Sequence, residues 1–387
     1  MTKKMLVIPG GFVPYNDTVT LLVYKRLRNL DYDFDVLALK GKVDLGIANE
    51  LEKDINIRKF TINYLCDYDD CIAIQHPLRL LKSLYYMNKY IKEAVKMFEG
   101  NNYDELYTSS VPGITHLCGY VIKKKYPNVK WHASFSDPIK NSPYKKDPDL
   151  KKRNIFYRIA FKIGSFIYMN NLYEEVAIKN ADELVFICEE QKNFTLKQYE
   201  NSETYSSKCK IEPLTYIPDW QMYKDLMNAP EIHNLPKQAV HLGRLYGLRK
   251  IDSFLLALKE LKENDPLLSN KVIFHQYSDI QPYDLKKVKE YNLNDVFVVH
   301  SKVSYSESIK IMREADILVL FDTLLENEEI QPYLPSKIVE YQLLRKPILG
   351  ICGKNSPSYR ILSEDGGNYV GCTKNKIKEN ILNLIKV

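Results

Sequence analysis

The chain has 387 residues, of which 45% are hydrophobic and 27% are charged, and it carries a net charge of +6. This length predicts two domains, because a single hydrophobic core seldom extends beyond about 250–300 residues. The basic excess favours anionic partners such as a nucleotide or a phospholipid surface. Nucleic acid is the least favoured partner, because the sequence has no run of five like charges and no recognisable nucleic-acid-binding motif.

Seven cysteines are scattered without C-x-x-C spacing, and several lie inside apolar segments. This usage predicts buried thiols in a reducing compartment rather than metal ligands. The N-terminal apolar run is too short for a signal peptide, and no later stretch reaches the roughly 18 apolar residues of a membrane span. We therefore expect a cytoplasmic protein, at most peripheral on the inner face of the cell membrane.

In the first half, short apolar runs alternate with longer amphipathic segments. The predicted strands are residues 5–9, 34–39, 105–109, 129–135 and 183–188, and the predicted helices are residues 17–29, 78–98, 113–125 and 152–180. This alternation is typical of βαβ units around a parallel sheet. It predicts a Rossmann-like domain over residues 1–210.

The second half repeats the alternation after a proline-rich segment, residues 211–238, which predicts an interdomain linker. Its predicted strands are residues 239–243, 271–277, 296–300, 317–321 and 347–351, and its predicted helices are residues 250–262, 283–290, 304–314, 335–344 and 374–386. We expect a second Rossmann-like domain over residues 239–373, so that two doubly wound α/β domains face each other across a cleft. Ligands bind such sheets at the carboxyl ends of the strands.

The stretch HLGRLYGLRKIDSF opens the second domain and predicts a strand, a tight turn and the start of a helix. The turn carries Arg244, Arg249 and Lys250. Helix N-termini attract anions and arginine offers a fork to phosphate oxygens, so this turn suits a diphosphate. A solvated basic turn explains the same charges equally well.

A second turn of this kind lies in PYLPSKIVEYQLLRKPILGI, where Ser336 and Lys337 begin a predicted helix. Serine is a favoured N-cap residue, and the N–H groups that follow can meet an anion. Glu340 lies one turn later and suits a ribose diol, as carboxylates do in other nucleotide sites. A capped structural helix with a solvated glutamate is the alternative, but two such turns in one sheet favour a ligand site.

Together, GRLYGLRKID, ESIKIMREADILVLF and LPSKIVEYQLLRKPILG resemble the donor-binding domain of GT-B glycosyltransferases of the family 4 kind. Residues 107–138, which end in Asp-Pro after a strand, and ADELVFICEEQ resemble first-domain segments of the same family. The resemblance implies a retaining, metal-independent enzyme that moves a sugar from a nucleotide-diphosphate donor to a glycan or lipid-linked acceptor. It further implies a role in bacterial surface polysaccharide or glycolipid synthesis, and a final helix, residues 374–387, that crosses back to the first domain.

By this resemblance, Arg244 and Lys250 neutralise the donor diphosphate, and Arg249 shares or takes over that role. Gly10 and Gly11 match a loop after the first strand that closes on the donor. Glycine at this place permits close approach of the backbone to a ligand.

The resemblance also implies that the backbone of Ser336 and Lys337 meets the phosphates and that Glu340 binds the nucleotide ribose. The family often has an earlier glutamate that touches the donor sugar, but Pro332 occupies its position here. Either Glu328 or Glu329 replaces that residue from a shifted loop, or backbone amides bind the donor sugar without a glutamate.

Two side chains near the end of the fourth predicted strand, His132 and Asp137, are candidates for the base that deprotonates an acceptor hydroxyl. A hydrogen-bonded structural histidine is the alternative for His132, and His116 is a weaker candidate. The D-x-D letters in CDYDDC, residues 66–71, suit a divalent cation but lie away from the cationic turns. We therefore expect no metal site and no other cofactor.

Two predicted helices, residues 76–98 and 149–171, combine aromatic and basic side chains, and the second begins near Lys151, Lys152 and Arg153. Such helices can lie on anionic membranes. Core helices with snorkelling lysines and arginines show the same pattern. The sequence is equally consistent with a membrane-facing helix and with a core helix.

Other functions fit the same resemblance. A nucleotide-sugar epimerase or hydrolase of this fold would act without an acceptor. A catalytically silent relative would serve as a binding subunit, an alternative with which the missing first glutamate is compatible. A two-domain solute-binding protein is disfavoured, because the sequence shows no export signal.

Overall fold

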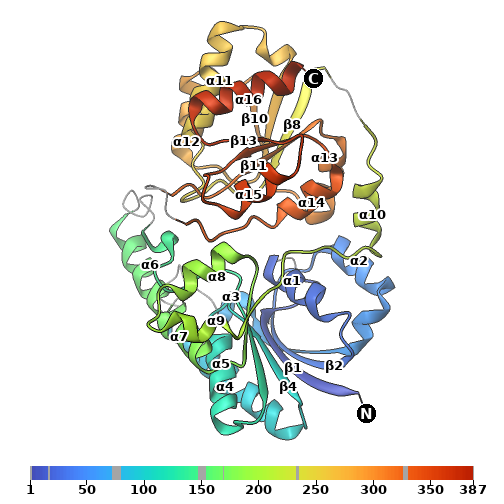
Figure 1. The fold of residues 1–387 in the computed structure, drawn as a ribbon, viewed down its shortest axis with the longest axis vertical. Helices are drawn as coiled ribbons and strands as arrows, with labels where there is room; N and C mark the ends of the chain where they lie inside the picture. The colour runs from blue at the N-terminus through green and yellow to red at the C-terminus, as the bar shows by residue number, and fades with distance from the viewer. Residues whose placement is uncertain are drawn as a thin grey trace. The chain divides into compact units, whose positions relative to one another are not determined.

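The structure is a computed structural model that describes residues 2–15, 18–71, 80–146, 154–168, 170–231, 235–325 and 330–386. The chain divides into two compact units, Met1–Thr215 and Tyr216–Val387 (Figure 1). The division falls inside residues 211–238, which the prolines mark as a linker.

The N-terminal unit is built on a seven-stranded parallel sheet with the strand order β3-β2-β1-β4-β5-β6-β7 (Figure 1). Its strands are β1 (Lys3–Gly11), β2 (Tyr32–Lys40), β3 (Phe60–Asp67), β4 (Glu105–Ser109), β5 (Lys130–Ser134), β6 (Glu183–Phe186) and β7 (Cys209–Ile211). All five predicted strands are present. The sequence missed the two edge strands because β3 buries only its first residue and β7 has three residues.

The C-terminal unit is built on a six-stranded parallel sheet with the order β10-β9-β8-β11-β12-β13. Its strands are β8 (Lys237–Leu242), β9 (Val272–Tyr277), β10 (Phe297–His300), β11 (Ile317–Phe321), β12 (Ile348–Ile351) and β13 (Tyr369–Val370). The five predicted strands are confirmed. The edge strand β13, with two residues, is too short to show a period in the sequence.

Helices join successive strands in both units. In the N-terminal unit they are α1 (Thr18–Leu27), α2 (Leu45–Lys53), α3 (Tyr68–Cys71), α4 (Leu80–Gly100), α5 (Ile114–Lys125), α6 (Ile155–Tyr168), α7 (Asn171–Asn180), α8 (Glu189–Leu196) and α9 (Ser202–Ser206), with the 3-10 helices η1 (Ile55–Lys59) and η3 (Pro143–Lys146). In the C-terminal unit they are α10 (Gln221–Met227), α11 (Asp252–Asn264), α12 (Pro282–Glu290), α13 (Tyr305–Glu314), α14 (Lys337–Leu344), α15 (Pro357–Glu364) and α16 (Lys374–Lys386), with the 3-10 helix η5 (Leu268–Asn270). The single helix predicted over residues 152–180 is two helices, because Asn170 caps α7 by accepting a hydrogen bond from the Leu172 N–H at 3.0 Å.

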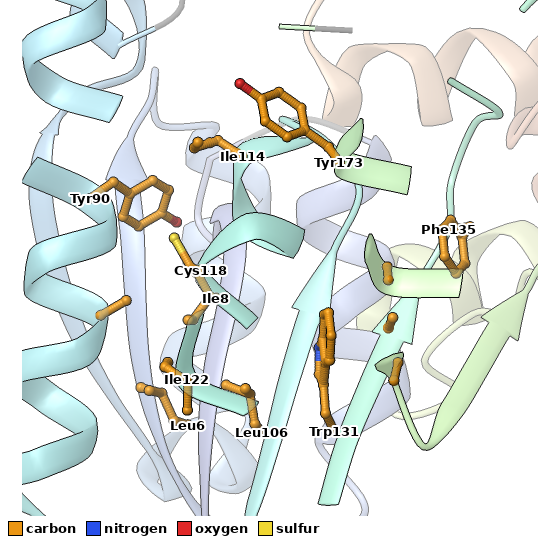
Figure 2. Packing of buried hydrophobic residues seen from close by; sticks show 14 of the residues in the cluster. Leu6, Ile8, Tyr90, Leu106, Ile114, Cys118, Ile122, Trp131, Phe135 and Tyr173 are labelled. Atoms are coloured by element: carbon orange, nitrogen blue, oxygen red, sulfur yellow. The ribbon is translucent and has the colours of Figure 1, made fainter. Parts of the chain in front are cut away.

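The core of the N-terminal unit lies between its sheet and helices α4, α5 and α7. Leu6 and Ile8 alternate along β1 and both enter this core. Figure 2 shows Tyr90 of α4 directed toward Cys118 of α5. The Trp131 ring of β5 packs closely against Gly119 of α5. All of these side chains are fully buried, so the sheet is a rigid base for the loops at its edges.

The final helix α16 belongs to the C-terminal core, where Ile377, Ile381 and Leu384 are buried against the sheet and α11. Lys374 at its start forms an ion pair of 2.7 Å with Glu260 of α11. The family resemblance implied that this helix crosses back to the first domain. Its apolar face is instead used within its own unit.

The predicted linker is not wholly irregular, because it contains α10. Trp220 and Tyr223 are fully buried, and the Tyr223 hydroxyl lies 2.9 Å from the hydroxyl of Tyr305 on α13. These contacts attach the second part of the linker to the C-terminal unit. Among the helices that the structure describes, none is long and apolar enough to cross a bilayer.

Candidate functional site

The strand order of each sheet identifies where a ligand is expected. In the C-terminal sheet the chain adds β9 and β10 on one side of β8 and then places β11 on the other side. In the N-terminal sheet the same reversal lies between β1 and β4. Open α/β sheets bind ligands outside the carboxyl ends of the two strands at such a switch point.

The turn after β8 places the three predicted cations in different surroundings. Arg244 donates from Nε to Asp279 Oδ2 at 3.2 Å, and the two side chains are 61% and 71% exposed. Arg249 is half-buried, and its Nη1 donates to the Arg244 carbonyl at 3.4 Å. Lys250 is also half-buried and lies two residues before α11 begins. Arg249 and Lys250 are therefore more buried than Arg244.

Several buried polar atoms at this switch point have no hydrogen-bond partner among the described residues. They are Arg249 Nε, His241 Nε2, Gln276 Oε1 and Asp322 Oδ2. Burial, together with the smaller effect of the nearby charges of Arg249 and Lys337, lowers the pKa of His241 to about 3. Buried polar groups without partners cost free energy, so the cluster marks a place suited to a polar ligand or to water.

His241 is held in one orientation, because its Nδ1 lies 2.8 Å from the Val319 carbonyl oxygen of β11 and must donate to it. This bond leaves Nε2 as an acceptor on a neutral ring. Gln276 of β9 donates from Nε2 to the Gly243 carbonyl at 2.7 Å and so fixes the start of the cationic turn. Gln276 thus supports the start of the turn, whereas His241 links β8 to β11.

The start of α14 lies at the same edge of the sheet, because this helix follows β11. Ser336 occupies the N-cap position, but its hydroxyl makes no capping hydrogen bond, since its backbone is helical (φ −61°, ψ −26°) rather than extended. Lys337 Nζ donates to Ser308 Oγ at 3.3 Å and lies 4.9 Å from the centre of the Tyr305 ring, and burial lowers the pKa of this lysine. Glu340 is buried and accepts a hydrogen bond of 2.6 Å from the Tyr305 hydroxyl.

In the N-terminal unit, Gly10 and Gly11 are the last two residues of β1, paired with Ala38 and Leu39 of β2. They are therefore part of the strand and not of a loop after it. Gly10 has a φ of +81°, and a Cβ atom there would collide with the carbonyl oxygen of Val111. The close approach that glycine permits at this position is made by the chain's own backbone.

Asp137 is exposed in the bend that follows β5, at the carboxyl edge of the sheet. The loop after it is anchored by Glu174, a fully buried carboxylate on α7. Glu174 accepts hydrogen bonds from the Ile139 N–H at 2.6 Å, the Lys140 N–H at 3.2 Å and the Tyr199 hydroxyl at 2.7 Å. Asp137 thus lies near an anchored loop at the carboxyl edge of the sheet, the edge at which open α/β sheets generally bind ligands.

His132 does not lie at that edge, so the prediction that it faces the ligand side is wrong. Its Nε2 is 2.5 Å from Glu105 Oε2 and its Nδ1 is 3.0 Å from Glu183 Oε1. These glutamates are the first residues of β4 and β6, so the imidazole points toward the amino ends of the strands. Two carboxylates hold the ring in a buried polar cluster that links three strands.

His116 and Asp70 of the D-x-D motif also make contacts within the protein that fit a structural role. His116 is fully buried in α5, its Nδ1 lies 2.8 Å from Thr108 Oγ1, and burial lowers its pKa to about 3. In CDYDDC, Asp70 pairs with Lys82 at 2.6 Å. Within the described ranges, no group of three His, Cys, Asp or Glu side chains is arranged to hold a metal ion.

The chain is similar over its whole length to solved structures of glycosyltransferases. The similarity to TarM has a TM-score of 0.63 at 11% identity and covers 100% of this chain and 92% of that one. For HepE from Anabaena in complex with UDP-glucose the TM-score is 0.59 at 12% identity, covering 99% and 90% of the two chains. For WaaG, a glycosyltransferase involved in lipopolysaccharide biosynthesis, it is 0.58 at 12% identity, also covering 99% and 90%.

No protein-family model matches the chain, and no curated protein matches its sequence. At these identities the similarity defines the fold. Together with the two parallel sheets, it shows that the chain has the GT-B fold of two Rossmann-like α/β domains.

The site differs from the sequence prediction in the residues that were missed. His241 and Gln276 each lie one residue before the carboxyl end of a strand, and Asp322 directly follows a strand. Polar side chains at the carboxyl ends of strands are the signal that could have found them. Glu329 and the glutamate before it lie outside the described residues.

Proposed function

We propose that the protein is a glycosyltransferase of the family 4 kind that moves a sugar from a nucleotide-diphosphate donor to a glycan or lipid-linked acceptor. The observation that carries this proposal is the cationic turn at the switch point of the second sheet, where Arg249 and its neighbours present buried polar atoms that lack partners in the described chain. The fold supports it, since HepE was solved with UDP-glucose and WaaG acts in lipopolysaccharide biosynthesis. A role in bacterial surface polysaccharide or glycolipid synthesis, on the cytoplasmic side, is part of the proposal.

In the proposed reaction, the bond between the sugar and the diphosphate breaks, and negative charge develops on the leaving diphosphate. Arg249, Lys250 and Arg244 stabilise this charge together with the N–H groups at the start of α14. Because fixed cations supply the stabilisation, the proposed reaction needs no divalent metal. The acceptor oxygen forms the new bond to the sugar carbon, and we propose, from the family resemblance, that the sugar keeps its anomeric configuration. Glu340 holds the ribose, and Asp137 is the base toward the acceptor hydroxyl.

A thermal-shift screen tests the donor. We expect one nucleoside diphosphate among UDP, GDP, ADP and dTDP to raise the unfolding temperature by about 5–10 °C at 100 times its Kd, since such saturation adds about 2.7 kcal/mol. A shift by none of the four nucleotides or of their sugar conjugates would contradict the proposal.

Product analysis then separates the reaction types. With a sugar nucleotide alone, an epimerase or hydrolase would convert the donor, whereas a transferase needs the acceptor. Turnover should persist in EDTA. Tight nucleotide binding without turnover across an acceptor panel would indicate a binding subunit instead.

We further propose that the N-terminal unit contacts an anionic membrane through α6. The outward face of this helix is apolar: Ile155, Phe156, Ile159, Ile163 and Phe166 are 57%, 81%, 50%, 40% and 73% exposed. At 100° per residue these five side chains fall within one stripe, and the exposed cations Arg158 and Lys162 lie along its border. An apolar stripe beside basic side chains fits the interface of a bilayer that carries anionic lipids. Lys151, Lys152 and Arg153, which the sequence also suggested for this surface, lie outside the described residues.

Co-sedimentation with liposomes tests this contact. Replacing Arg158 and Lys162 together by serine should weaken binding to anionic vesicles by about 30-fold, at about 1 kcal/mol per cation. Binding of the unaltered protein should fall with salt, because the screening length is about 10 Å at 0.1 M. The matched control replaces Lys286 and Lys289 on α12 by serine, which removes the same charge elsewhere. Equal recovery of all variants in the supernatant would refute the membrane contact.

A further inference from the structure

Two cysteine side chains lie together at the end of the edge strand β3. Cys66 is the residue before the last of this strand, and Cys71 is the last residue of α3, the one-turn helix that follows it. In the sequence CDYDDC the chain thus turns back, and α3 packs against β3. The two cysteines do not have C-x-x-C spacing, but this turn brings their thiols into hydrogen-bonding contact.

The two thiols have different surroundings. Cys71 is fully buried in the core of the N-terminal unit, near Tyr90 of α4 and Cys118 of α5, which Figure 2 labels. Cys66 is only partly buried and packs against the rim of this core. Its strand is at the edge of the sheet. Cys66 is therefore the member of the pair that a small solute can reach.

The hydrogen bond gives the two sulfur atoms different chemical roles. The Cys71 thiol donates to Cys66, which lowers the pKa of Cys66, and the nearby ammonium of Lys89 adds to this effect. Partial burial and the carboxylates of Asp70 and Asp67 oppose it. The same hydrogen bond and burial raise the pKa of Cys71. Because the thiolate is the reactive form of cysteine, Cys66 is the nucleophile of the pair and Cys71 its protonated partner.

We propose that Cys66 and Cys71 form a peroxide-reactive dithiol, in which Cys66 attacks the oxidant and Cys71 then closes a disulfide. The inference does not depend on the proposed function. In a reducing compartment, disulfides are usually transient and serve catalysis or redox sensing, which is the behaviour expected of this pair. The sulfur atoms are already in contact, so the bond can form with little movement of α3.

The proposed oxidation has two steps. The Cys66 thiolate attacks one oxygen of hydrogen peroxide and the O–O bond breaks, so that Cys66 becomes a sulfenic acid and the other oxygen takes up a proton and leaves as water. The Cys71 sulfur then attacks the Cys66 sulfur, the S–O bond breaks, and the hydroxyl leaves as water with the Cys71 proton. Two thiols are thereby oxidised to one disulfide while one peroxide is reduced to two molecules of water. A thiol reductant reverses the change.

Peptide mapping by mass spectrometry tests the proposal on the full chain. The reduced protein is treated with hydrogen peroxide, and the remaining thiols are alkylated. We expect the peptide that contains both cysteines to lose two hydrogen atoms and to resist alkylation until dithiothreitol is added. Cys209 is the internal comparison, because it is also partly buried but burial raises its pKa to about 11. Cys66 should react at least about tenfold faster than Cys209, since the thiolate fraction falls about tenfold for each unit of pKa.

Three serine variants separate the roles of the thiols. In Cys71→Ser, oxidation should stop at the sulfenic acid of Cys66, which a 1,3-dione probe traps. In Cys66→Ser, the fast oxidation should be lost. Cys118→Ser is the matched control, because Cys118 lies near Cys71 but burial raises its pKa and keeps it protonated. This control should form the disulfide at the rate of the unaltered protein, and unfolding temperatures check the folding of each variant.

Three outcomes would overturn the inference. In the first, both thiols of the pair stay open to alkylation while Cys209 is oxidised. In the second, the disulfide joins Cys71 to Cys118 or links two copies of the chain. In the third, Cys66→Ser is oxidised at Cys71 as fast as the unaltered protein. Nucleotide binding plays no part in these measurements, so each of these failures leaves the proposed function unaffected.

Discussion

Replacing Arg249 by alanine should lower turnover by about 100- to 1,000-fold, as removal of one preorganised donor to a developing negative charge does in other enzymes. Arg249 is half-buried, and its Nε has no partner within the described chain. Its charge also reaches His241 and Asp322 at the switch point. A cation in this position is little screened by water and needs no reorganisation when a diphosphate leaves.

Arg244 provides the matched comparison in the same turn. It is 61% exposed and shares its charge with Asp279, so Arg244→Ala should reduce turnover less than Arg249→Ala. The turnover of Lys250→Ala is expected to be closer to that of Arg249→Ala than to that of Arg244→Ala. The measurement is steady-state turnover with the donor that the thermal-shift screen selects, with unfolding temperatures as a check on folding. Near-normal turnover of Arg249→Ala would remove this residue from the diphosphate site.

The ranking of the two arginines illustrates what a sequence can and cannot establish. The letters GRLYGLRKID place both residues in one turn, and the resemblance favours Arg244. The difference between them depends on the ion pair of Arg244 with Asp279 and on the burial of Arg249, which are tertiary contacts. The charge pattern alone therefore located the cationic turn, but it could not show which of the two arginines contributes more to the diphosphate site.

The elements of the fold were predictable where a segment is apolar throughout. β11, with the sequence ILVLF, is fully buried and was located to the residue. β3 was missed because it lies at the edge of its sheet and exposes polar side chains. The sequence predicted one continuous helix over α6 and α7, because the break between them depends on one capping residue, Asn170.

The candidate site was only partly predictable for a related reason. His132 lies on a predicted strand, as expected, but two glutamates far away in the sequence draw its ring to the other end of the sheet. Ser336 precedes its helix as expected, yet its backbone angles remove the cap. Positions along elements follow from local sequence, whereas the direction and partners of a side chain depend on which strands become neighbours.

Gly10 gives the largest expected effect on stability. A residue other than glycine at φ +81° is strained, and a Cβ atom at this position would also meet Pro112 Cδ at 2.5 Å in addition to the Val111 carbonyl. The left-handed conformation costs about 1–2 kcal/mol for an L-residue, and overpacking of a buried site costs about 1–3 kcal/mol. Gly10→Ala should therefore lower the free energy of unfolding of the N-terminal unit by about 2–5 kcal/mol.

Urea unfolding of Gly10→Ala, followed with and without a saturating nucleoside diphosphate, distinguishes the two roles of this glycine. If the glycine serves the chain's own backbone, as its contact with Val111 indicates, the loss of stability is present without nucleotide. Gly100→Ala is the matched control, because Gly100 ends α4 with no atom near its Cβ position, and this change should alter stability by about 1 kcal/mol or less. If Gly10→Ala instead kept the stability of the unaltered protein and lost nucleotide binding, Gly10 would serve the approach of a ligand, as the family resemblance implies.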